Sequence, residues 1–159
     1  MSFLRFLMLL ALIVWVGGLI FFPVAAGTAF SVLPTPHLAG LVVRRTLIIL
    51  HWMGIVSGLV FLAVSLLYAR LGHGAFQVFS ARNVLVLVML VLTGISQFAI
   101  IPRMDKLRDT LGDVASAAAS NPLRMQFDAL HVWSTRVEGG VLLLGLVLTF
   151  LVARQLKYS

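Results

Sequence analysis

Three long runs of this sequence contain no Asp, Glu, Lys or Arg, and they constrain the fold more than any other feature. The runs are Phe6–Pro36, Thr46–Ala69 and Asn83–Pro102. A transmembrane helix needs about 20 mostly apolar residues, so each run is long enough to cross a bilayer. Of all side chains, 61% are apolar and 11% are charged, whereas a soluble domain has about 25% charged residues. We therefore predict an all-α integral membrane protein, which excludes a disordered chain, a nucleic-acid-binding domain and an ordinary cytosolic enzyme.

A fourth apolar run, Gly139–Ala153, is shorter than the others, with 15 residues. At about 1.5 Å per residue it cannot cross about 30 Å of hydrocarbon. We therefore expect the fourth helix to begin near Leu130. It then carries His131, Arg136 and Glu138 into or close to the membrane.

These runs predict one four-helix transmembrane domain over residues 1–159, with spans at roughly 4–30, 44–69, 83–103 and 130–153. Residues 104–129 are expected to form an extramembrane helical hairpin between the third and fourth spans. Its apolar positions recur at helical spacing: Met104, Leu107, Leu111, Val114 and Ala118. The pair Asn121-Pro122 is typical of a helix cap followed by a proline in the first turn, so the fourth helix can begin as early as Pro122.

The charged residues give two conflicting indications of orientation. The side with the termini has no acidic residue and holds Arg5, Arg70, Arg82, Arg154 and Lys157. Net charge therefore favours cytoplasmic termini, whereas the number of Lys and Arg slightly favours the opposite orientation. Several charges on the opposite side lie inside helices or a folded loop, which weakens that count. We expect a protein of the bacterial inner membrane with both termini in the cytoplasm.

Polar residues in the spans are spaced so that they share helix faces. These sets are Arg44, His51, Gly58 and Ser65 on the second helix, Thr93 and Gln97 on the third, and His131, Thr135 and Glu138 on the fourth. Gly54 and Gly58 also form a GxxxG pair, which permits close helix approach. The spans thus have polar stripes that face the bundle rather than lipid.

The depths of three of these residues agree. His51 lies seven residues from Arg44, Gln97 six residues from Arg103, and Glu138 seven residues from His131. Each separation is roughly 9–10 Å along a helix axis. This predicts a polar pocket open to the side away from the termini. The candidate binding residues are His51, Gln97, Glu138, Arg44 and His131, and we predict no catalytic or metal-ligating residue.

Each candidate also has a purely structural interpretation. Glu138 could pair with Arg44 or Arg136 to hold the bundle together, and His51 and Gln97 could be hydrogen-bonded packing residues. A haem b between His51 and His131, or a metal ion held by these histidines and Glu138, fits the ligand types. However, His131 is expected nearer the surface than His51, and the spacing is not diagnostic of a metal. The cofactor thus stays unknown, and the absence of cysteine excludes thiolate ligands and disulfides.

Four segments together resemble a known family. They are WVGGLIFF at Trp15–Phe22, LHWMG at Leu50–Gly54, QFAIIPRMDKLR at Gln97–Arg108 and LHVWSTRVEGGVLLLGL at Leu130–Leu146. In this order they are similar to the transmembrane protein 205-like family and its bacterial relatives, which carry a domain of unknown function. The resemblance implies a four-helix membrane bundle and supplies no reaction. The residues that fall within these segments are His51, Gln97, Arg103, Arg108, His131 and Glu138.

Three functions compete on this basis. The first is a non-enzymatic accessory or scaffold subunit of a larger membrane complex, such as an energy-transducing one. The alternative is a module that binds or transports a small molecule or metal ion through the polar pocket. An enzyme acting on lipid or quinone is the third, but the sequence has no Ser-His-Asp order, HExxH or phosphate loop. We expect the partners to be the lipid bilayer and other membrane subunits or a second copy, and no nucleic acid.

Overall fold

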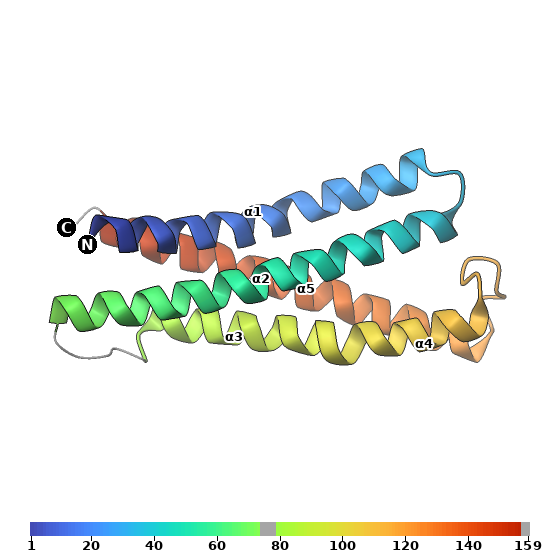
Figure 1. The fold of residues 1–159 in the computed structure, drawn as a ribbon. Helices are drawn as coiled ribbons and strands as arrows, with labels where there is room; N and C mark the ends of the chain where they lie inside the picture. Colours follow the sequence, from blue (N-terminus) through green and yellow to red (C-terminus); the bar gives the residue numbers. More distant parts are fainter. Residues whose placement is uncertain (74–78, 157–159) are drawn as a thin grey trace.

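The computed structural model describes residues 1–73 and 79–156, which form a bundle of long antiparallel helices (Figure 1). The elements are α1 (Ser2–Val32), α2 (Pro36–His73), α3 (Ala81–Ile95), the π-helical turn η1 (Ser96–Ile100), α4 (Ile101–Leu111) and α5 (Pro122–Leu156). Because α3, η1 and α4 follow one another without a break, the described residues contain four helical rods. Lys157, one of the basic residues from which the orientation was predicted, lies outside the described residues.

All four rods are long and apolar enough to cross a membrane. The predicted all-α, four-helix membrane bundle is therefore confirmed, and the chain is an integral membrane protein. The helices are longer than the expected spans: α1 has 31 residues and α2 has 38. At about 1.5 Å per residue they extend about 46 and 57 Å, beyond the 30 Å or so of hydrocarbon.

The helix ends follow from local sequence. Thr35 accepts a hydrogen bond from the backbone N–H of Leu38 at 3.3 Å, ahead of the first-turn proline of α2. Asn121 accepts one from Leu123 at 2.9 Å, so α5 begins at Pro122 as the cap signal allowed. The expected helical spacing through Val114 and Ala118 is wrong beyond Leu111. Gly112 ends α4 there with a φ of 70°, a conformation that favours glycine.

The π-helical turn has a cause in the sequence. Pro102 has no backbone N–H, and its ring would meet the carbonyl four residues earlier in a regular α-helix. The backbone widens just before it, and the N–H of Ile101 donates to the carbonyl of Ser96, five residues back. The turn contains Gln97, so the proline also sets the direction of this side chain.

Most of the tightly packed core lies in the half of the bundle that contains the start of α1 and the end of α5, which we call the terminal end. Trp15 of α1 is 3% exposed and fills the groove left by Gly54 and Gly58 of α2. A Cβ at Gly58 would lie 2.7 Å from the Trp15 ring, so the GxxxG pair is needed for this packing. The remaining core residues include Met8, Leu12, Phe61, Val86, Met89, Val141 and Leu148.

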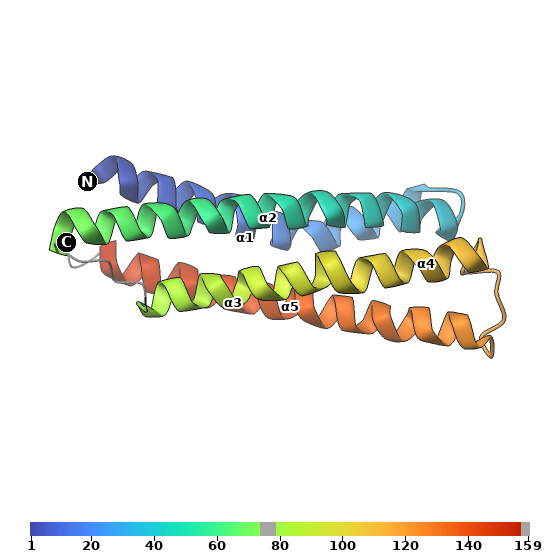
Figure 2. The ribbon, with the colours of Figure 1, turned by 60° about the horizontal axis from the view of Figure 1, so that its bottom comes forward.

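The opposite half, which we call the cavity end, is more open. Figures 1 and 2 show α1 and α5 close together at the terminal end and diverging toward the other end. Here α1 carries Pro23 inside the helix, where the missing N–H and the ring disturb regular geometry. A cavity lies in this half, lined by α1, α2, α4 and α5.

Candidate functional site

Three of the predicted residues meet inside the bundle. The His51 ring, 1% exposed, has Nδ1 at 2.8 Å from Gln97 Oε1 and Nε2 at 2.6 Å from Glu138 Oε1. The three side chains come from α2, η1 and α5, so one imidazole links three of the four rods. The depth argument placed these residues together, and the structure brings them into direct contact.

The donors and acceptors of this cluster define its protonation. Gln97 Oε1 can only accept, so Nδ1 of His51 carries a proton and donates it. A contact of 2.6 Å between Nε2 and the carboxyl oxygen of Glu138 requires one further proton between them. That proton makes either an imidazolium beside a carboxylate or a neutral imidazole beside a carboxylic acid. In both arrangements the pair has no net charge, which is how an ionisable pair is tolerated in a membrane.

The second oxygen of Glu138 is left over. Oε2 is buried and receives no hydrogen bond from any residue that the structure describes. The Glu138 side chain as a whole is 13% exposed and lines the cavity at the open half of the bundle. A buried acceptor without a donor is unfavourable by about 1–3 kcal/mol. The carboxyl group of Glu138 is thus hydrogen-bonded through Oε1 only, in a side chain that also lines the cavity.

The cavity has a volume of about 680 Å³, within the range of 300–1,000 Å³ typical of small-molecule sites. One wall is apolar and comes from α1, through Leu19, Phe22, Pro23, Ala26 and Phe30. These positions recur at helical spacing, so one face of α1 provides the wall. The opposite wall comes from α5 and contains polar groups, including His131, Ser134 and Thr135.

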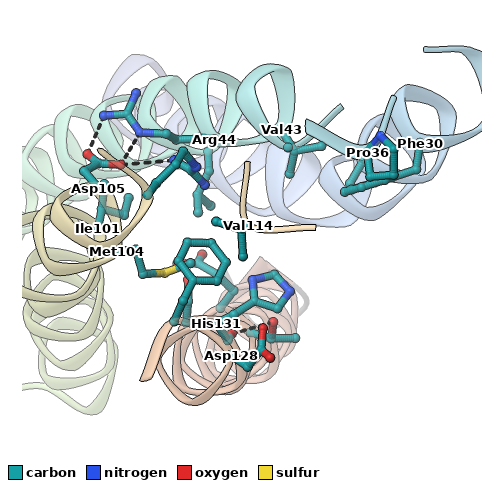
Figure 3. A pocket seen from close by; sticks show the side chains of 18 of the residues that line it. Phe30, Pro36, Val43, Arg44, Ile101, Met104, Asp105, Val114, Asp128 and His131 are labelled. Carbon is teal, nitrogen blue, oxygen red and sulfur yellow. Dashed lines mark hydrogen bonds and ion pairs between the residues drawn. The ribbon is translucent and has the colours of Figure 1, made fainter. Parts of the chain in front are cut away.

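Ion pairs line the rim (Figure 3). Asp105 of α4 accepts two hydrogen bonds from the Arg44 guanidinium and a third from Arg108, at 3.2 Å. The Nδ1 atom of His37 lies 3.7 Å from Asp113. On α5, Arg124 lies 3.8 Å from Asp128 and also donates to the carbonyl of Ala117. These contacts tie α2 to α4 and the 112–121 connection to its neighbours.

We call His51, Gln97 and Glu138 the triad. The other two predicted residues, Arg44 and His131, lie apart from it. Arg44 pairs with Asp105, and Glu138 pairs with His51. Neither Arg44 nor Arg136 is therefore the partner of Glu138. His131 is exposed and lines the cavity about two helical turns from Glu138. Both ring nitrogens of His51 are engaged, so neither is directed at a haem iron or a metal ion. Among the described residues, no three His, Asp or Glu side chains gather as metal ligands would.

Sequence reasoning missed three features of the site. The sequence did not single out Asp105, which is the residue that joins Arg44 and Arg108. The apolar wall from α1 carries no polar signal and reads as an ordinary membrane segment. The widened turn at Gln97 could have been found from Pro102, because a proline five residues downstream is a recognised cause of irregular helix geometry.

Comparisons with known proteins identify the family of this chain. A comparison with curated proteins and one with solved structures each returned no match. A family model described as a domain of unknown function, DUF4149, matches residues 10–112. The match begins inside α1 and runs through α2, α3, η1 and α4, so it includes His51 and Gln97. It ends before α5, which supplies Glu138. Since it spans well over half of the chain, the protein belongs to the DUF4149 family of domains of unknown function.

Proposed function

We propose that this chain is a non-enzymatic membrane protein that binds a small, largely apolar molecule in the cavity between α1 and α5. The observation that supports this is a cavity of about 680 Å³ that combines an apolar wall from α1 with a few polar side chains from α5, Glu138 among them. Ligand sites combine mostly apolar linings with a few polar groups in this way. The proposal corresponds to the binding module considered from the sequence.

Filling the cavity tests this proposal. The double variant Ala26→Phe, Gly139→Leu adds bulk from α1 and α5, both of which line the cavity. The control is Val24→Phe, on α1 but 60% exposed and outside the lining. Each protein is extracted gently from its own membrane and weighed by native mass spectrometry. We expect a small non-covalent adduct on the wild type and the control and its loss from the double variant. A bare wild-type chain, or an adduct that survives cavity filling, contradicts the proposal.

A second candidate is an accessory or scaffold subunit of a larger membrane complex. Arg136 supports it, because this residue is exposed on α5 and lies outside the cavity lining, with its guanidinium over the exposed Trp133 ring. A charge on the outer face of a span is unfavourable unless a partner or the membrane interface accommodates it. Another membrane subunit or a second copy of this chain would supply such a partner. The same native mass measurement detects it as a larger assembly that Arg136→Leu should dissociate.

The proposal also includes a family relationship and a membrane location. The four sequence segments that resemble the transmembrane protein 205-like family support a relationship to that family beyond the DUF4149 match. The resemblance to bacterial relatives supports a bacterial inner membrane location, and the absence of acidic residues on the side with the termini supports cytoplasmic termini. Single cysteines at Ser2 and Arg154, which lie at the terminal end, test this orientation by labelling with a membrane-impermeant thiol reagent in intact cells. Labelling of both from outside contradicts cytoplasmic termini.

A further inference from the structure

Two buried hydroxyl groups close to the triad have no hydrogen-bond partner. Thr93 of α3 is 1% exposed and Ser96 of η1 is 0% exposed. Their side-chain oxygens, like Oε2 of Glu138, make no hydrogen bond to any residue that the structure describes. Nearly all buried polar groups in folded proteins are hydrogen-bonded, either to another residue or to an ordered water molecule. Three unpartnered groups so close to one another therefore indicate a shared partner.

The three groups lie at nearly the same level of the bundle. The His51 ring contacts both Gln97 and Glu138, so these two residues are level with each other. Ser96 directly precedes Gln97 in the chain, and Thr93 lies about one helical turn from Gln97 toward the terminal end. The hydroxyl of Ser96 is thus at the level of the Glu138 carboxyl group, and that of Thr93 is about one turn away.

The three groups also lie on helix stripes that face each other. The buried residues of α3 and η1 follow at intervals of three or four, which makes one stripe: Asn83, Val86, Met89, Thr93, Ser96 and Ile100. A similar stripe on α5 contains Ser134, Glu138, Val141, Gly145, Leu148 and Val152. The two stripes are in contact, because a Cβ placed at Gly145 would lie 3.3 Å from the end of the Met89 side chain. Thr93 and Ser96 therefore lie across this interface from Glu138.

The donors and acceptors of these groups match one water molecule. A water accepts from the two hydroxyl groups and donates to Oε2, which makes the three or so hydrogen bonds that are typical of a buried water. A cation would leave both hydroxyl hydrogens without an acceptor and would add a charge to the neutral pair of His51 and Glu138. We infer that a water molecule is bound between η1 and α5, where it links Ser96 and Thr93 to Oε2 of Glu138.

The bound water closes a ring of hydrogen bonds. The ring runs from Gln97 through His51 and Glu138 to the water, and from the water to Ser96, the neighbour of Gln97 in the chain. Both carboxyl oxygens of Glu138 are then hydrogen-bonded, which fixes the orientation of this side chain at the wall of the cavity. The site is enclosed in the bundle, and the inference does not rest on the proposed function.

Hydroxyl-radical labelling by a short X-ray pulse tests the inference, because a bound water releases radicals that oxidise the buried side chains beside it. The wild-type protein in lipid nanodiscs is irradiated, and oxidation is assigned to single residues by tandem mass spectrometry. His51 reports on the water, and Phe61 of the same helix, 2% exposed and in the apolar core, is the dry reference. Each rate is divided by the rate of the same residue in the unfolded chain. We expect the corrected rate of His51 to be several-fold above that of Phe61.

A double variant tests which residues hold the water. Thr93→Val with Ser96→Ala removes both hydroxyl donors, so the rate of His51 should fall to that of Phe61. The control is Thr149→Val, because the Thr149 hydroxyl donates to the carbonyl of Gly145 at 2.8 Å and is away from the triad. It should leave the rate of His51 unchanged. Circular dichroism and elution volume show whether the double variant folds; if it does not, Ser96→Ala alone is measured, and the rate should still fall.

Three outcomes overturn the inference. Equal corrected rates of His51 and Phe61 in the wild type mean that no water lies beside the triad and that the hydroxyl groups find partners within the protein. An unchanged rate of His51 in the folded double variant means that water from another place, such as the cavity, labels it. A rate that changes when Na⁺ is replaced by N-methylglucamine means that a cation competes for the site. None of these outcomes decides whether the cavity binds a ligand, which the native mass measurement tests separately.

Discussion

The two ends of the bundle differ in how their buried and partly buried polar groups are hydrogen-bonded. At the terminal end, Ser65 donates to Asn83 at 2.8 Å, and Arg5 donates to the Tyr68 hydroxyl at 2.6 and 2.9 Å. These groups hold neighbouring helices together without facing a cavity. At the cavity end, the carboxyl of Glu138 is satisfied on one side only and lines a space of about 680 Å³.

The difference follows from how closely the helices approach. At the terminal end, glycines at 54 and 58 admit the Trp15 ring, and the helices interlock around it. One turn further along α1, Leu19 belongs both to the packed core and to the cavity wall, so the boundary lies there. Beyond it α1 and α5 diverge. Polar residues of similar type therefore join helices where packing is tight and line a cavity where the helices separate.

The largest effect is expected at the triad. His51→Ala leaves Gln97 and Glu138 buried without their shared partner, and removing one member of a buried pair is unfavourable by about 3–5 kcal/mol. The double variant His51→Leu, Glu138→Leu should regain most of this stability, because it removes the pair as a whole. Thermal unfolding in a mild detergent, followed by circular dichroism, measures both. A single variant as stable as the double one would contradict the predicted cost of leaving Glu138 buried without His51.

A smaller loss is expected from Gly54→Ala, which places a methyl group against the buried Trp15 ring. Overpacking of this kind destabilises by about 1–3 kcal/mol. Gly94→Ala is the matched control, since no atom lies within 4 Å of the added Cβ, and alanine favours a helix over glycine by roughly 0.5–1 kcal/mol. The two unfolding temperatures should therefore move in opposite directions. Movement in the same direction would remove Trp15 packing as the explanation for the closed end.

Ser65→Ala tests the terminal end and is expected to cause a smaller loss of stability. It removes one hydrogen bond to Asn83 and is expected to lower the free energy of unfolding by about 1 kcal/mol. Because the α2 residues that line the cavity end at Leu47, well before Ser65, the adduct sought by native mass spectrometry should be the same as on the wild type. A changed adduct with unchanged stability would mean that the two ends are coupled.

The smallest change in stability is expected from Asp105→Asn, which weakens the contacts to Arg44 and Arg108. Both partners of the Arg44 pair are partly exposed, and such pairs contribute about 1 kcal/mol or less. The local effect should be larger: hydrogen exchange over 101–111 should rise as α4 loses its link to α2. Asp109→Asn, an exposed neighbour on the same helix, is the control. Equal exchange in the two variants would show that the Arg44–Asp105 pair does not hold the rim.

Much of the candidate site could be anticipated because a helix converts sequence distance into depth. His51, Gln97 and Glu138 each lie six or seven residues from a polar residue near the same side, so their convergence could be predicted from the sequence. The ion pairing could not. Glu138 had two nearby arginines as candidate partners, and only the angles between helices decide that His51 lies against it while Arg44 reaches Asp105.

The sequence by itself determined that this chain has four helices long and apolar enough to cross a membrane, and that the fourth can begin at Pro122. The physical reason is local: charge-free runs and the pair Asn121-Pro122 act through their own backbone and immediate neighbours. Only the tertiary structure decided that α1 and α5 separate on one side of Trp15 and that a cavity lies between them. A cavity depends on the relative tilt of α1 and α5, which lie at opposite ends of the sequence, and no local pattern encodes that tilt.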